Sequence, residues 1–215
     1  MSQATQVFSA PPTWLVVALE EHLPYSLPLL RRLQFTSYPK GRTPSSHVVF
    51  VGGSDDAAQT ATKIDAFAAA YVDFSRGLET QMWMYSTLED GQADDATLLL
   101  CEDQIVTLVA EVGRISSQFT EQRAYPNSVL IGTLNAVVRS AMEKRGICVR
   151  ARSALGYEKW LVKVDDLPAE DVLPDGMTWA AVTAADCVLV LSRTAIQRQV
   201  YEPVQPSSRM PLMTV

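Results

Sequence analysis

The sequence predicts an α+β fold, with a mixed but mainly antiparallel sheet flanked by helices. Helical periodicity fills the first 35 residues, and short β-branched or aromatic segments follow at 47–53, 67–74 and 80–87. Helices followed by antiparallel strands are typical of α+β proteins. With 215 residues, of which 47% are hydrophobic and 20% charged, the chain can bury a core without disulfides or a metal.

The N-terminal region is predicted to form two short helices. The prolines at 11–12 precede an amphipathic stretch that ends near His22. A second helix is expected at 26–35, where the leucines can face the core while Arg31 and Arg32 point outward. The two helices should pack as an αα-hairpin, and the Pro-, Gly- and Ser-rich residues after them should form a loop.

The strand expected at 80–87 contains the candidate ligand-binding residues, Trp83 and Tyr85. They alternate with Met82 and Met84, so the two pairs should lie on opposite faces of the sheet. Because both faces are apolar, we expect this strand to be central and covered on each side. Aromatic residues on such a strand usually belong to the core, and a ligand pocket lined by Trp83 and Tyr85 is the alternative.

The middle of the chain alternates between helical and extended patterns. A helical pattern covers 94–119, and a strand at 128–132 should run into a helix ended by Gly146. Two further strands are expected at 147–155 and 158–164.

An acidic, proline-containing linker at 165–176 precedes a last unit at 177–194, predicted as a strand followed by a helix. In that unit Thr183 suits the N-cap and Asp186 the third helical position. The last residues contain prolines and no period, which predicts an irregular tail. The domain organisation expected from these patterns is 1–165, then 166–199, then a tail at 200–215.

Charge and composition narrow the class of partner. A net charge of -6 argues against nucleic acid or an anionic membrane. Cys101, Cys148 and Cys187 lie far apart in apolar segments, and His22 and His47 form no metal-ligand pair. We therefore expect no metal site, buried reduced thiols and a cytoplasmic protein.

Three segments, 22–35, 70–90 and 173–199, resemble the N-terminal part of fungal GNAT-superfamily proteins of the glycine N-acyltransferase-like branch. The third reads LPDGMTWAAVTAADCVLVLSRTAIQRQ. The resemblance implies a degenerate GNAT-like domain over 1–165, followed by the beginning of an acyl-CoA-binding domain.

The sequence departs from that family at the cofactor loop. A working GNAT domain binds the acyl-CoA pyrophosphate on the backbone N–H groups of a [QR]-x-x-G-x-[GA] turn at a helix N-terminus. No copy of this motif is found in the chain. We therefore expect no cofactor, with acetyl-CoA or another acyl-CoA as the alternative if the loop takes another form.

Two functions are consistent with these patterns. One is a shortened GNAT-like protein that has lost ordinary acyl-CoA transfer and acts as a binding or interaction module. The other is a non-standard enzyme acting on a small molecule in a fungal biosynthetic pathway, or a residual N-acyltransferase, with a pocket around Trp83 and Tyr85. A gene-model fragment is a third interpretation. The expected partners are a small-molecule ligand and a second copy of the chain, which would pair through residues 177–192.

Overall fold

The computed structural model describes residues 4–39, 41–53, 66–77, 79–91, 94–122, 128–150, 162, 175–178 and 180–193. Contacts divide the chain into two compact units, 1–161 and 162–215, and each is described by itself. The strand predicted at 158–164, except for residue 162, most of the linker at 165–176 and the tail at 200–215 lie outside the described residues.

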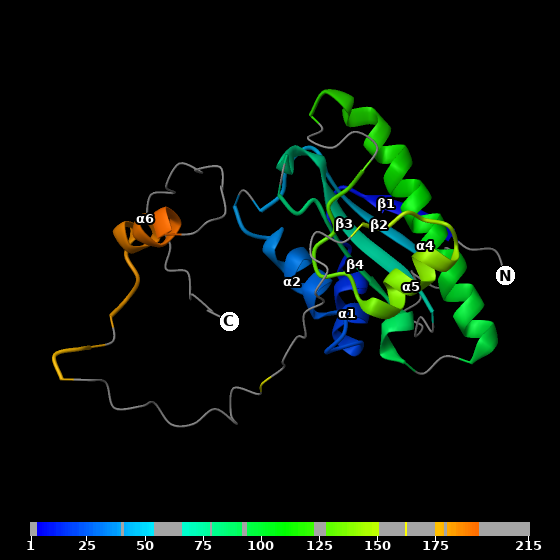
Figure 1. The fold of residues 1–215 in the computed structure, drawn as a ribbon, viewed down its shortest axis with the longest axis horizontal. Helices are drawn as coiled ribbons and strands as arrows, with labels where there is room; N and C mark the ends of the chain where they lie inside the picture. Colours follow the sequence, from blue (N-terminus) through cyan, green and yellow to red (C-terminus); the bar gives the residue numbers. More distant parts are fainter. Residues whose placement is uncertain are drawn as a thin grey trace. The chain divides into compact units, whose positions relative to one another are not determined.

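A four-stranded antiparallel sheet forms the centre of the first unit (Figure 1). Its strands are β1 (Ala4–Phe8), β2 (Ser46–Gly52), β3 (Ala68–Asp73) and β4 (Met82–Ser86), in the order β1-β2-β3-β4. The last three confirm the sequence prediction, and so does the α+β class. Strand β1 was not predicted from the sequence. It has five residues, lies at the edge of the sheet and has no fully buried residue, so its apolar pattern is weak.

The prediction that β4 is central is wrong, because β4 ends the strand order. The N–H groups of Gln81 and Met82 both donate to the Leu130 carbonyl, and the Gly132 N–H donates to the Met82 carbonyl. Met82 and Ile131 thereby form an isolated parallel bridge. The strand predicted at 128–132 is reduced to this single bridge. The returning chain covers this part of the edge, and helices cover both faces of β4, so an edge strand can be apolar on both sides.

Helices α1 (Thr13–Glu21) and α2 (Leu27–Phe35) cover one face of the sheet and form the predicted αα-hairpin. Proline begins the first helix, and cap residue His22 ends it as expected. The core on this face consists of Leu15, Leu19, Leu29, Leu30, Leu33, Val48, Phe50, Phe67, Ala69, Tyr71 and Tyr85.

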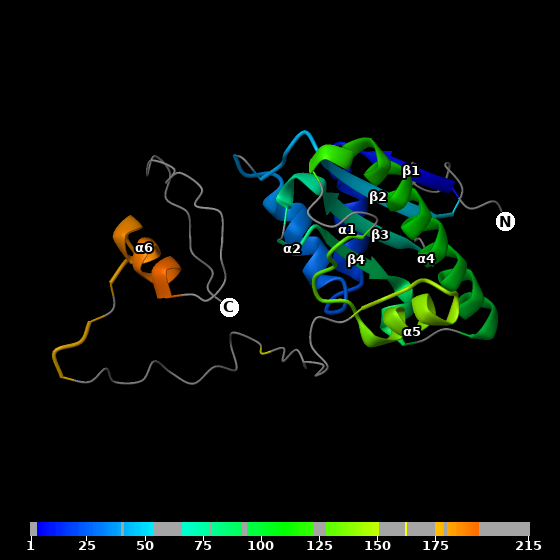
Figure 2. The same ribbon diagram turned by 45° about the horizontal axis from the view of Figure 1, so that its top comes forward.

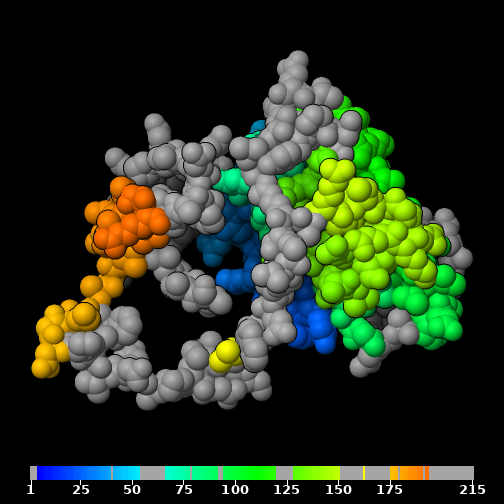
Figure 3. Space-filling model, viewed as in Figure 1, coloured from blue at the N-terminus to red at the C-terminus, as the bar shows by residue number. Residues whose placement is uncertain are grey.

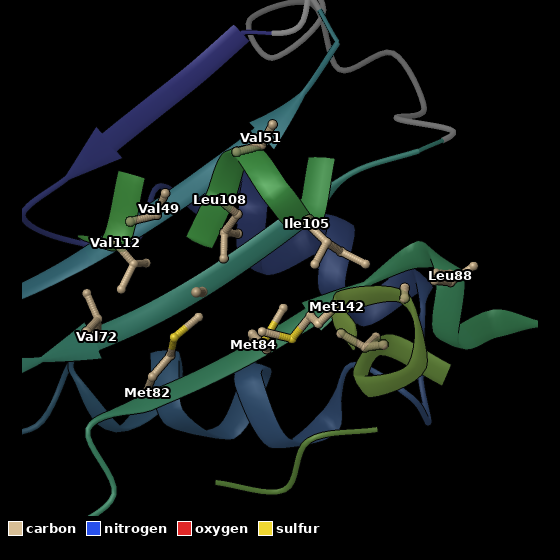
Figure 4. Packing of buried hydrophobic residues seen from close by; sticks show 14 of the residues in the cluster. Val49, Val51, Val72, Met82, Met84, Leu88, Ile105, Leu108, Val112 and Met142 are labelled. Carbon is tan, nitrogen blue, oxygen red and sulfur yellow. The ribbon is translucent and has the colours of Figure 1, made fainter. Parts of the chain in front are cut away.

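Helices α4 (Asp95–Ser116) and α5 (Ala136–Lys144) lie on the opposite face, so the first unit has three layers (Figure 2). Figure 4 shows Ile105, Leu108 and Val112 of α4 pointing toward the sheet. Met82 and Met84 lie in this core, which confirms the predicted alternation along β4. Helix α5 ends before Gly146, whose φ of 79° is the left-handed conformation expected of a C′ glycine. The segment at 128–150 forms a continuous surface beside α4 (Figure 3).

In the second unit, helix α6 (Ala184–Arg193) begins as predicted. The Thr183 N–H donates to Asp186 Oδ2 at 2.8 Å, and the Asp186 N–H donates to Thr183 Oγ1 at 3.3 Å. This reciprocal pair is a capping box. No strand is found among residues 177, 178 and 180–183, so that part of the prediction is wrong for the residues described. A strand needs a neighbouring strand to satisfy its backbone, whereas a capped helix satisfies its own.

Burial of the three cysteines was predicted, and it is confirmed only for Cys101. Cys148 and Cys187 are exposed. The strand expected to bury Cys148 does not form over 147–150, and Cys187 lies on a helix whose described side chains are exposed. Among the residues described, none of the helices combines the length and the apolar character needed to cross a bilayer.

Candidate functional site on the aromatic face of the sheet

The aromatic side chains of β4 lie on the face that α1 and α2 cover. Trp83 is paired with Tyr71 of β3 and Tyr85 with Ala69, and the Tyr71 and Trp83 ring centroids are 6.1 Å apart. Tyr85 is fully buried, whereas Trp83 is only half-buried at the margin of the core. The core interpretation therefore holds for Tyr85 and only partly for Trp83. Ligand contact by either residue stays a prediction.

Tyr85 belongs to a hydrogen-bonded network with Asp90 and His22. Its hydroxyl donates to Asp90 Oδ1 at 2.8 Å, and Asp90 Oδ2 lies 2.6 Å from His22 Nδ1. Burial, followed by the bond to Asp90, raises the pKa of Tyr85 far above its usual range. The hydroxyl therefore remains a donor at neutral pH, and one carboxylate joins the end of α1 to the segment after β4.

The local sequence after β4 returns Asp90 toward Tyr85. The 3-10 helix η2 (Thr87–Asp90) begins with a capping box between Ser86 and Glu89. Gly91 then adopts φ 74°, a left-handed conformation that favours glycine and ends the turn. Asp90 is 68 positions from His22 in the sequence, so local patterns give no indication of this pairing.

A carboxylate that orients an imidazole is the arrangement used for proton transfer in many enzymes. Here the His22 side chain is only 13% exposed, and its ring packs against Phe67 and Tyr85. The described residues place no hydroxyl or thiol nucleophile in hydrogen-bond contact with it. The thiol of Cys101 is buried beside Thr87, and burial raises its pKa. The described contacts of the network join the end of α1 to η2.

The Trp83 end of the site carries two arginines. The Arg32 guanidinium lies 5.0 Å from the Trp83 ring and 4.3 Å from the Tyr71 ring, and it donates to the Tyr71 hydroxyl at 2.8 Å. The Arg76 guanidinium lies 5.4 Å from the same Trp83 ring and pairs with Glu79 at 2.9 Å. These distances are typical of cation–π contacts.

The prediction that both arginines of α2 point outward is correct for Arg31 and wrong for Arg32. Arg31 is exposed and bonds to Gln34. Arg32 follows the buried Leu29 by three positions and therefore shares the helix face that packs on the sheet. Its long apolar stem allows a charged residue to occupy that face.

The junction between β4 and α4 is acidic. Asp94 caps α4 by accepting the Thr97 N–H at 2.8 Å. Hydrogen bonding by the Thr97 side chain, followed by this backbone bond, lowers the pKa of Asp94. Glu89 and Asp90 are the last two residues of the 3-10 helix η2, and Asp95 lies in the first turn of α4. The N-terminus of a helix favours a negative charge, and the carboxylate of Asp94 already supplies one at α4.

Two open grooves occur elsewhere on the described surface. A groove of about 430 Å³ lies between α4 and α5, with Leu98, Val137 and the ion pair of Glu102 and Lys144 in its lining. A second, of about 370 Å³, is lined by residues including Arg42 and His47. Neither groove is lined by Trp83 or Tyr85.

A family model described as the N-terminal domain of the acyl-CoA N-acyltransferase verG matches residues 4–160. The match confirms the relation to GNAT acyltransferases that the sequence predicted. No curated protein and no solved structure matches the chain.

Proposed function

Because the chain belongs to the acyl-CoA N-acyltransferase verG N-terminal domain family, we propose that residues 4–160 act as a binding or interaction module that does not hold the acyl-CoA pyrophosphate. The observation that carries this proposal is the occupied, acidic N-terminus of α4. Asp94 accepts the Thr97 N–H there, and Asp95 lies in the first turn of the helix.

Electrostatics at this helix end oppose cofactor binding. A pyrophosphate is held where several free backbone N–H groups converge without competing negative charge. At α4 an incoming diphosphate would have to displace the Asp94 carboxylate and approach further carboxylates of like charge. The absence of a [QR]-x-x-G-x-[GA] turn from the sequence supports the same conclusion.

We expect calorimetric titration of the full chain with acetyl-CoA to give no saturable heat at micromolar concentrations. The physical reason is that the Asp94 carboxylate already accepts a backbone N–H at the start of α4, where a diphosphate would have to bind. A cooperative thermal transition of the same sample serves as the control for folding. Saturable micromolar binding would contradict the proposal.

Pairing of two copies through α6 is a second proposal. Val188, Leu189 and Val190 are between 48% and 65% exposed, which is unfavourable in water. Two antiparallel α6 helices would bury the neighbouring side chains of Val188 and Leu189 against the same residues of the second copy.

Light scattering on the purified chain tests the pairing. We expect a mass of about 47 kDa, twice the 23.6 kDa of one chain, at micromolar concentration. Val188→Asp should shift the mass toward 23.6 kDa, because it places a charge in the apolar contact. A 23.6 kDa species for the unaltered chain would refute the proposal.

A further inference from the structure

We propose that Arg32, Arg76 and Trp83 form a binding site for a small planar aromatic molecule that carries an oxyanion, either a carboxylate or a phosphate. The two guanidinium groups converge on the same Trp83 ring, at 5.0 and 5.4 Å from its centroid. The inference stands apart from the proposed lack of acyl-CoA binding, because the site lies on the opposite side of the sheet from α4.

Charge is the first argument for this site. Arg32 forms no ion pair within the part of the chain that the structure describes, although the chain as a whole is acidic. The Arg32 and Arg76 guanidiniums both lie within 5.4 Å of the Trp83 ring centroid, so two positive charges share one aromatic side chain. Glu79 offsets only Arg76. An oxyanion bound beside the Trp83 ring would be attracted by both positive charges.

Unused hydrogen-bonding capacity is the second argument. The Nε atoms of Arg32 and Arg76 are buried and have no hydrogen-bond partner. The Arg32 guanidinium has one described bond, to the hydroxyl of Tyr71, which in turn donates to the buried Asp73 carboxylate at 3.4 Å. Stacking on aromatic rings holds the guanidinium in place. Both side chains keep part of their surface accessible. A ligand oxyanion would therefore bind the accessible part of each guanidinium rather than the buried Nε atoms.

The aromatic surroundings indicate a planar ligand body. Arg32 also lies 5.2 Å from the Phe35 ring, and the Phe35 and Tyr38 rings are 6.1 Å apart. Phe35 is 47% exposed and Tyr38 is 48% exposed, beside the half-buried Trp83. Exposed aromatic rings next to a cation favour a ligand that is both flat and anionic.

The test uses the full chain and three probes that share a naphthalene ring, 2-naphthoate, 2-naphthyl phosphate and the uncharged 2-naphthamide, titrated by calorimetry. We expect at least one anionic probe to bind about tenfold or more tightly than the amide, because a charge-assisted bond is absent from the latter. The tighter of the two anions identifies whether a carboxylate or a phosphate is preferred. Equal affinity for the amide and both anions would overturn the proposal.

Matched variants locate the site. R32Q and R76Q should each weaken the anionic probe by about tenfold, whereas R31Q, which alters the neighbouring exposed arginine, should leave its affinity unchanged. R32K keeps the positive charge but lacks the planar guanidinium that stacks on the rings, so it should lose less affinity for the anionic probe than R32Q. Equal losses in R32K and R32Q would mean that packing of the guanidinium, and not its charge, accounts for the effect. Equal losses in R31Q and R76Q would exclude this location. Thermal transitions of all variants check that each is folded, and R76Q keeps the test decisive if R32Q does not fold.

Discussion

Phe67→Ala is expected to lower the free energy of unfolding by about 3–5 kcal/mol, as for other fully buried phenylalanines. Phe67 is completely buried, and its ring lies 5.4 Å from His22, 5.6 Å from Phe50 and 5.6 Å from Tyr85. Its loss would leave a cavity between α1 and the sheet. Urea unfolding followed by circular dichroism measures the change.

Phe35→Ala is the matched control for this substitution. Phe35 is 47% exposed, and its main described contacts are with Tyr38 and Arg32. Its removal should cost less than about 1 kcal/mol, the scale of an exposed cation–π contact. Similar losses for the two variants would show that Phe67 does not lie at the centre of this core.

Asp90→Ala should destabilise the protein by about 1–3 kcal/mol or more, because it leaves the buried Tyr85 hydroxyl without its acceptor. The same substitution also removes the partner of His22 Nδ1. Thermal and urea unfolding provide the measurement. Glu20→Ala, at an exposed position of α1, should change stability by less than about 0.5 kcal/mol.

A double-mutant cycle separates the Tyr85–Asp90 hydrogen bond from other effects of the Asp90→Ala substitution on η2. Tyr85→Phe removes the hydroxyl that needs Asp90, so it should cost less in the Asp90→Ala background than in the unaltered chain. The expected coupling is about 0.5–3 kcal/mol. Strict additivity would mean that Tyr85 and Asp90 do not interact in solution.

The relation to acyltransferases and the fold class could both be predicted from sequence, whereas the contacts of the candidate site could not. Alternation alone placed Tyr85 on a buried face, but it gave no sign that Asp90 would accept a hydrogen bond from its hydroxyl. Arg32 is adjacent to Arg31 in the sequence and was assigned to the same solvated face. Successive residues of a helix are about 100° apart, so Arg32, unlike Arg31, lies on the side of α2 that faces the sheet. There its guanidinium packs on the Tyr71 and Trp83 rings.

What the sequence determined by itself is local. The capping box of Thr183 and Asp186, the C′ glycine Gly146 and the two faces of β4 each depend on residues a few positions apart, so propensity and periodicity suffice. The tertiary structure alone decided that β4 lies at the edge of the sheet, that His22 meets Asp90 and that Arg32 meets Trp83. These contacts join residues 49 to 68 positions apart, and their partners are selected by which surfaces remain available once helices and strands pack.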